Sequence, residues 1–162
     1  MRRFWWMPLL VVGCQSAPPP PPPSQSAAPA PIEEAFATAL LRRDFEMAYE
    51  LTTKDEATVG SPQTLMAKVD VMYARTKLPN GQPWRPTKIK LAVKGEPPAP
   101  DDLDRIFSRQ FTAAELEGLD YAMVPFAGDD DPPGFVPPIL HVLMKNGKVA
   151  FFAFESPRYA RR

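Results

Sequence analysis

The sequence predicts an α+β fold, in which helices in the first half of one domain pack on an antiparallel sheet of about four strands that ends in a β-hairpin. Apolar residues recur at helical spacing over residues 32–51 and again after Ser61-Pro62. Later they alternate with lysines over residues 87–94, and two apolar runs flank Asn146-Gly147. Helices first and an antiparallel sheet last are typical of the α+β class.

The first helical segment, residues 32–51, carries a broad apolar face. Asp44 would fall inside this face if the helix were continuous, so we expect a break near Arg43 and a second helix capped by Asp44. Ser61-Pro62 begins the next helix, because serine is favoured at the N-cap and proline at the first helical position. Pro79-Asn80-Gly81 ends that helix.

The first predicted strand is residues 87–94, where the alternation of apolar residues and lysines predicts one buried and one solvent-exposed face. The long connection over residues 95–118 contains the capping-box pattern Thr112-Ala113-Ala114-Glu115, which predicts a short helix. Residues 119–127 form the next predicted strand, and Pro125 inside it indicates an edge or a bulge.

The last two strands, residues 139–145 and 148–155, flank Asn146-Gly147, the strongest short-range hairpin signal. A two-residue turn would place His141 opposite Phe152. Both faces of this hairpin are apolar, and helices can cover only one of them. We therefore expect the connection over residues 95–118, or a partner such as a second copy of the chain, to cover the other.

The helix and strand faces together predict a set of buried residues. These are Leu40, Phe45, Leu65, Val69, Leu91, Val142 and Phe151.

The N-terminus has the pattern of an export signal. Met1-Arg2-Arg3 precedes an uncharged run to Gly13 that is too short to span a bilayer. Val11-Val12-Gly13-Cys14 resembles the lipobox of bacterial lipoproteins. The resemblance implies that residues 1–13 are a signal peptide, and that Cys14 is lipidated and becomes the acylated mature N-terminus. An ordinary signal peptide with a chance cysteine and an uncleaved anchor are the alternatives.

The lipidated Cys14 and the segment that follows it, together residues 14–31, form a predicted spacer. Residues 15–31 consist mainly of proline, alanine, serine and glutamine and carry no charge, so they bury too little apolar surface to fold. Gln15 lacks the acidic character of an inner-membrane retention signal, so we expect a bacterial envelope location with the outer membrane favoured over the inner. The folded domain spans residues 32–157, and residues 158–162 form a basic tail.

Charge and cysteine content exclude several classes of function. The chain has 19 basic and 19 acidic residues, so it lacks the excess of positive charge that is typical of nucleic-acid binding. With the single cysteine lipidated, no disulfide can form. One histidine without a free cysteine leaves no set of nitrogen and sulfur ligands for structural zinc, and Asp129-Asp130-Asp131 lacks the alternate spacing of a calcium loop. We expect no cofactor and no metal.

A second resemblance covers most of the domain. Ala39-Leu40-Leu41-Arg42-Arg43-Asp44-Phe45, Ala48-Tyr49, Leu51 and the Ser61-Pro62 helix resemble nuclear transport factor 2-like (cystatin-like) domains. The resemblance implies helices on a strongly curved sheet that together form a cone with a pocket. The chain departs from the pattern at Arg43, where many relatives have glycine, and in the length of the connection over residues 95–118.

A cone of this kind makes His141, Trp84, Tyr49 and Asp44 the candidate pocket-lining residues. Each also has a structural interpretation. His141 and Trp84 suit a core, and Asp44 suits a helix cap. We assign no catalytic residue, because the sequence identifies no partner for a general base at His141.

These observations favour a lipid-anchored, non-enzymatic envelope protein whose domain binds a small apolar ligand or an envelope protein. An isomerase- or hydrolase-like enzyme with a cone-shaped pocket is one alternative. A purely structural envelope protein is the other.

Overall fold

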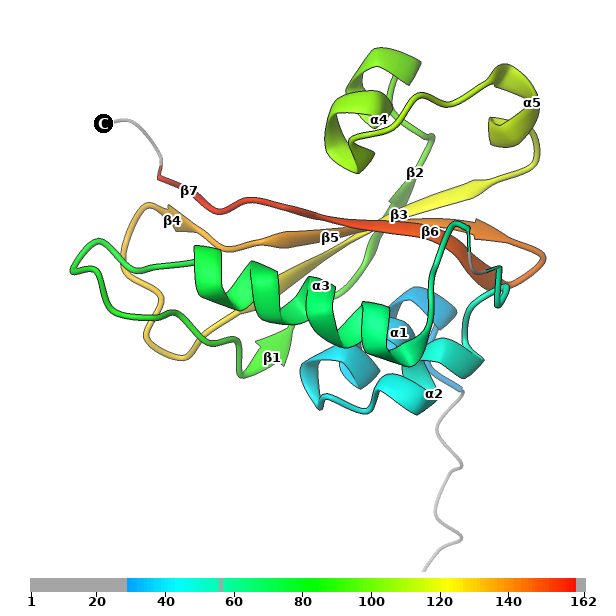
Figure 1. Ribbon diagram of the computed structural model, residues 1–162. Helices are drawn as coiled ribbons and strands as arrows, with labels where there is room; N and C mark the ends of the chain where they lie inside the picture. The colour runs from blue at the N-terminus through cyan, green and yellow to red at the C-terminus, as the bar shows by residue number, and fades with distance from the viewer. Residues whose placement is uncertain (1–28, 56, 160–162) are drawn as a thin grey trace, which may run out of the picture.

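The computed structural model describes residues 29–55 and 57–159, which form an α+β domain (Figure 1). The helices of this part are α1 (Ile32–Leu41), α2 (Phe45–Glu50), α3 (Pro62–Arg75), α4 (Pro100–Phe107) and α5 (Ala113–Leu116). The strands are β1 (Lys88–Ile89), β2 (Val93–Gly95), β3 (Asp120–Ala127), β4 (Phe135–Val136), β5 (Ile139–Lys145), β6 (Lys148–Glu155) and β7 (Arg158–Tyr159). The predicted fold class is confirmed.

The antiparallel sheet has five strands, one more than the sequence predicted, in the order β1-β3-β5-β6 with β2 also on β3. Strands β4 and β7 form a separate pair. Helices α1–α3 lie on one side of the sheet, and α4 and α5 lie on the other (Figure 1). The sheet is therefore covered from both sides, with β6 at one edge.

The predicted break near Arg43 and the predicted starts of α2 and α3 are confirmed, but α3 ends at Arg75, before the predicted stop at Pro79-Asn80-Gly81, because Thr76 is already extended. Helix α1 stops before Arg43, whose φ of 60° is left-handed, and the Asp44 carboxylate accepts the Met47 N–H at 3.0 Å to cap α2. The left-handed φ explains why glycine would be suited to the position of Arg43. Ser61 caps α3 by accepting the Thr64 N–H.

The hairpin forms at Asn146-Gly147 as predicted, but the predicted register is wrong beyond its first pairs. Val149 faces Met144, whereas Phe151 faces Leu143, because Ala150 is an extra residue in a β-bulge. Beyond the bulge every partner moves by one residue, so His141 faces Ala153 and Val142 faces Phe152. The bulge therefore sends Phe151 and Phe152 to the faces opposite to those predicted.

The single strand predicted over residues 87–94 is also wrong, since it is divided into β1 and β2. The Lys90 N–H donates to the Pro125 carbonyl at 2.8 Å, but proline has no N–H to return, so the ladder on β3 is interrupted there. Leu91 lies in this interruption and is 82% exposed, contrary to its predicted burial.

Two apolar clusters form on the two sides of the sheet. The larger lies under α1–α3 and includes Phe36, Leu40 and Phe152. The smaller lies under the α4–α5 connection and includes Leu143 and Phe151. Leu40, Leu65, Val69, Val142 and Phe151 are buried as predicted. Phe45 is only half-buried, because it begins α2 at the surface beneath the Arg43 guanidinium.

Two residues that the sequence analysis assigned to the basic tail form a strand. Arg158 and Tyr159 form β7 on β4, and the Tyr159 hydroxyl donates to the Lys77 carbonyl at 2.8 Å. These two residues therefore belong to the folded domain. The predicted signal peptide, Cys14 and most of the predicted spacer lie outside the described residues. Within the described ranges, every helix is too short or too polar to cross a membrane.

We predict that Leu40, which is buried, and Leu91, which is exposed, respond differently to truncation. Leu40→Ala should lower the free energy of unfolding by about 2–5 kcal/mol, because it leaves a cavity in the larger cluster. Leu91→Ala should change it by less than about 0.5 kcal/mol, as surface substitutions do. Urea unfolding measures both. A similar loss for the two variants would contradict the division of residues 87–94 into two strands.

Candidate functional site

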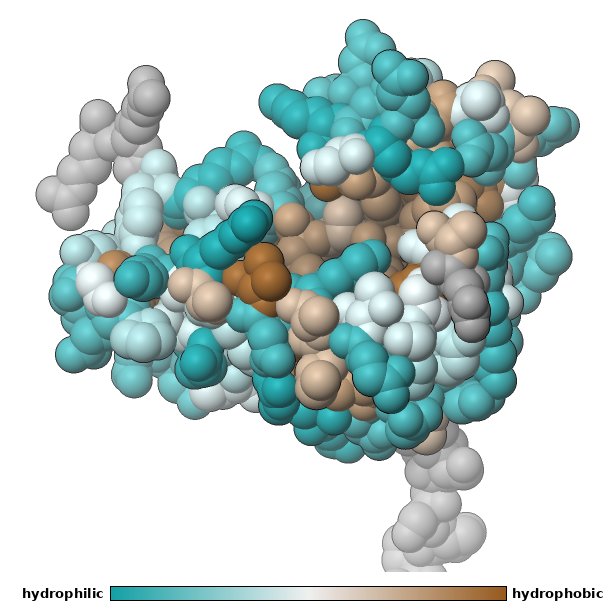
Figure 2. Space-filling view, viewed as in Figure 1, coloured by the Kyte–Doolittle hydropathy of each residue, from teal (hydrophilic) through white to brown (hydrophobic). Residues whose placement is uncertain are grey.

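A groove follows the edge of β6, between α3 on one side and α4 on the other. It has a volume of about 420 Å³, which lies within the usual range for ligand sites. Its lining residues are Thr64, Ala67, Lys68, Val71, Met72, Arg75, Thr76, Ile106, Phe107, Ser108 and residues 152–157. Figure 2 shows this region as a hollow with a predominantly apolar surface between the two helices.

The walls of the groove are apolar side chains that the two helices leave exposed. Val71 on α3 is 47% exposed, although α3 buries its opposite side in the larger cluster. Ile106 and Phe107 at the end of α4 face it across the strand. Phe152 and Phe154 form the floor. An apolar ligand would find partners on three sides of this groove.

Two cations stand on the α3 wall. The Lys68 ammonium lies 4.3 Å from the centroid of the Phe152 ring, and burial against this wall lowers the pKa of Lys68. Arg75 lies two helical turns further along α3. Among the described residues, neither has a carboxylate within ion-pair distance. The groove therefore offers positive charge beside an apolar floor.

The backbone of β6 supplies a third feature, an open edge. The Phe126 N–H donates to the Pro138 carbonyl, so alternate β5 residues from Leu140 onward direct their backbone groups to β3. The intervening residues, such as His141, direct theirs to β6, where His141 faces Ala153. The N–H and C=O groups of Phe152 and Phe154 consequently point away from β5, into the groove. In the described part of the chain, no hydrogen bond to another segment satisfies them.

Beside the groove, His141 belongs to a chain of three polar side chains. The Tyr121 hydroxyl lies 2.6 Å from His141 Nδ1, and His141 Nε2 lies 3.1 Å from a Glu155 carboxylate oxygen. A carboxylate only accepts, so Nε2 carries the hydrogen and Nδ1 accepts from the tyrosine. Arg158 pairs with the same Glu155 carboxylate. Glu155 reaches the groove, whereas His141 is 2% exposed.

This environment keeps His141 neutral. Burial lowers the pKa of His141 to about 4, and the Arg158 guanidinium acts in the same direction. Burial also raises the pKa of Tyr121 to about 12. Both ring nitrogens are occupied by partners within the protein, so neither is open to take a proton from a substrate.

The depressed pKa of His141 predicts a loss of stability in acid. Between pH 6.5 and 4 the unfolded chain binds a proton at this histidine and the folded protein does not, so stability is complete above pH 6.5 and falls as the pH drops towards 4. The loss from this residue should be about 3 kcal/mol. Unfolding of His141→Gln across the same pH range should lack this component. Parallel stability curves for the two proteins would show that the assignment is wrong.

The other three predicted pocket residues have structural positions. Trp84 is 2% exposed, and its indole N–H donates to the Asp131 carboxylate at 2.6 Å. Tyr49 is half-buried against the larger cluster, and Asp44 caps α2. With His141, these residues are spread over the domain and line neither the groove nor the two smaller depressions described next.

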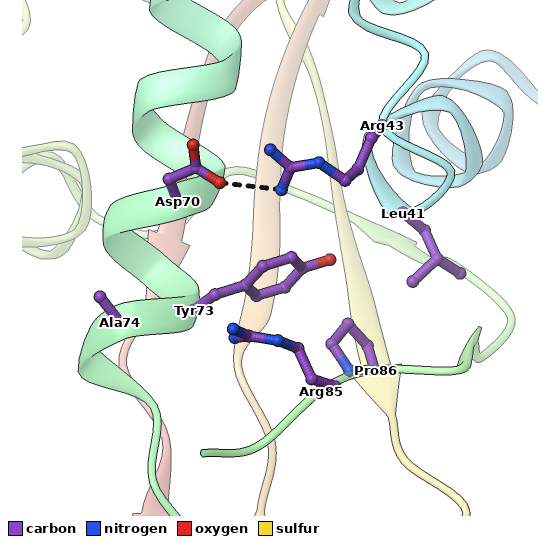
Figure 3. Close-up of a pocket in the computed structure, with 7 residues that line it drawn as sticks. All are labelled: Leu41, Arg43, Asp70, Tyr73, Ala74, Arg85 and Pro86. Atoms are coloured by element: carbon purple, nitrogen blue, oxygen red, sulfur yellow. Dashed lines mark hydrogen bonds and ion pairs between the residues drawn. The ribbon is translucent and has the colours of Figure 1, made fainter.

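One smaller depression, of about 340 Å³, lies between the α1–α2 turn and α3 (Figure 3). Its charged side chains are engaged with their neighbours. Arg43 pairs with Asp70 at 2.8 Å, and the Arg85 guanidinium lies 4.9 Å from the centroid of the Tyr73 ring. The first contact ties the α1–α2 turn to α3, and the second ties the segment before β1 to α3, so both have a structural role.

The other depression surrounds Glu33, whose carboxylate is fully buried at the start of α1. Lys94 Nζ lies 2.9 Å from one of its oxygens, at an ion-pair distance but without the angles of a hydrogen bond. Glu34 accepts the Ala92 N–H. These two contacts fasten β2 to α1. Nowhere in the described ranges do three or more histidine, cysteine, aspartate or glutamate side chains gather as metal ligands would.

The sequence did contain a signal for the groove. Lys68, Val71, Met72 and Arg75 follow one another at the i, i+3, i+4 and i+7 positions of a helix. The sequence alone does not distinguish this stripe from the buried face of the same helix, because Met72 belongs to both. The buried face consists of Leu65, Val69, Met72 and Tyr73. Only the path of α4 on the other side of β6 shows that the stripe borders a groove.

Comparisons of the chain with protein-family models, with curated proteins and with solved structures found no match. The resemblances to lipoproteins and to nuclear transport factor 2-like domains therefore stay predictions.

Proposed function

We propose that this protein is a lipid-anchored, non-enzymatic binding domain of the bacterial envelope, which holds an apolar segment of its ligand in the groove along β6. The observation that carries the proposal is the groove itself. Apolar side chains of α3, α4 and β6 surround it, and Lys68 stands over Phe152 without a carboxylate partner among the described residues. A large exposed apolar surface usually marks an interaction site.

The N-terminal sequence supports the anchored part of the proposal. Lipid on Cys14 would hold the chain at the membrane, because two or more acyl chains suffice for stable anchoring. An uncharged, proline-rich spacer over residues 15–31 would then hold the domain away from the bilayer. The predicted location is the outer membrane in preference to the inner.

The hydrogen-bonded side chains of Tyr121, His141 and Glu155 argue against the alternative of an enzyme. Its members satisfy one another, and the histidine is neutral and buried. A general base needs a free lone pair within reach of a substrate proton. A purely structural role would leave the exposed apolar walls of the groove unexplained.

We predict that the groove binds the apolar anionic dye bis-ANS. The complete mature chain, made with Cys14→Ser and without residues 1–13, should enhance the fluorescence of the dye. Val71→Trp should abolish the enhancement, because the indole fills the groove from an exposed position. Met66→Trp is the control, since Met66 is an exposed residue of α3 outside the groove. Equal enhancement by the two variants, or none by the unaltered groove, would refute the site.

We predict that Cys14 carries the lipid. Mass spectrometry of the protein from its native membrane should show a mature chain that begins at acylated Cys14. The Cys14→Ser variant should either stay in the membrane fraction with its signal peptide uncleaved or be released from the membrane. A mature N-terminus elsewhere, or normal processing and firm attachment of Cys14→Ser, would refute the anchor.

A further inference from the structure

We infer that the groove receives an extended protein segment, which pairs through its backbone with the open edge of β6 and places a carboxylate beside Lys68 and Arg75. This inference rests on the proposed function, since it names the kind of ligand that the groove holds.

The dimensions of the groove suit one short strand. The α3 wall runs from Thr64 to Thr76, which corresponds to a length of about 18 Å at a helical rise of about 1.5 Å per residue. The floor runs over residues 152–157, about 17 Å at a strand rise of about 3.4 Å per residue. The two lengths agree, and each matches an extended segment of about six residues.

The backbone of β6 is prepared for such a segment. Phe152 and Phe154 each present to the groove an N–H and a C=O that no described residue pairs with, and an extended peptide satisfies groups of this spacing. The same edge already accepts a segment nearer the hairpin turn. There the Thr53 N–H donates to the Val149 carbonyl at 2.9 Å, and the Val149 N–H donates to the Leu51 carbonyl at 3.0 Å. The edge is thus sealed at one end and open over the groove.

The side chains of the groove define the chemistry of the segment. Successive side chains of a strand point to opposite sides, so alternate residues would meet the α3 wall and the α4 wall. On the α3 wall Lys68 and Arg75 flank the apolar Val71. On the α4 wall Ile106 and Phe107 are apolar. The matching segment has β-branched or other apolar residues and at least one aspartate or glutamate on the α3 side.

Two other occupants fit less well. A second copy could offer its own β6 edge, but that edge lies in the same groove beside Lys68 and Arg75, so it would bring two further cations to the site. The proline-rich residues 15–31 of this chain carry no carboxylate, and proline cannot donate to a sheet edge. A segment of a different protein satisfies both the charge and the backbone.

The test is a selection from a library of random seven-residue peptides. The library is selected on the mature Cys14→Ser chain and counter-selected on the same chain with Val71→Trp. We expect enrichment of sequences with β-branched residues and at least one acidic residue. The binding of each enriched peptide should weaken by about tenfold or more when alternate peptide nitrogens are methylated, and by a similar factor with Lys68→Glu. Lys90→Glu, at an exposed lysine outside the groove, is the charge control and should have no effect.

Circular dichroism of each variant checks its folding, and Ala67→Trp blocks the groove in place of Val71→Trp if the latter is unfolded. The inference is overturned if no acidic, strand-forming sequence is enriched, or if methylated and unmethylated peptides bind equally. It is also overturned if dodecanoate, which has an apolar chain and a carboxylate but no peptide backbone, displaces bis-ANS while the selected peptides do not. In these cases dye binding survives and only the inference fails, whereas loss of dye binding removes the proposed function as well.

Discussion

Both faces of the β5–β6 hairpin are apolar, and the domain is organised by the need to cover both of them. Phe151 and Phe152 are consecutive residues of β6 and point to opposite faces, and the bulge at Ala150 determines which face each ring meets. Helices α1–α3 bury the face of Phe152, and the connection that contains α4 and α5 buries the face of Phe151. Because these two layers lie on opposite sides of the sheet, they do not close over the edge of β6, and the groove lies between them (Figure 2).

An uncovered edge strand is usually protected, since it can pair with any extended chain. In this domain the protection is partial. Leu51 and Thr53 occupy the edge at Val149, and a lysine, Lys68, stands beside the open part. Lysine near an edge discourages pairing with apolar or basic strands, but it favours a strand that carries a carboxylate. The same side chain can therefore protect the edge against aggregation and select the ligand.

Local signals in the sequence were sufficient for the helix N-caps and the hairpin turn, because a cap or a tight turn depends on a few neighbouring residues. Asp44, Ser61 and Asn146-Gly147 behave as predicted for this reason. The bulge at Ala150 and the exposure of Leu91 depend on the strand that lies alongside, and alternation alone does not show them. The two partners of His141 lie on β3 and β6, and the groove arises between elements far apart in the chain, so the sequence indicated neither.

Amide hydrogen exchange of the free mature chain tests whether the edge of β6 is open over the groove. The Ala153 N–H faces β5, whereas the Phe152 and Phe154 N–H groups face the groove. If it is open, the amides of Phe152 and Phe154 should exchange on the order of 100-fold faster than that of Ala153. Equal protection of all three amides would mean that this edge is already paired, and the groove would then have no backbone to offer a ligand.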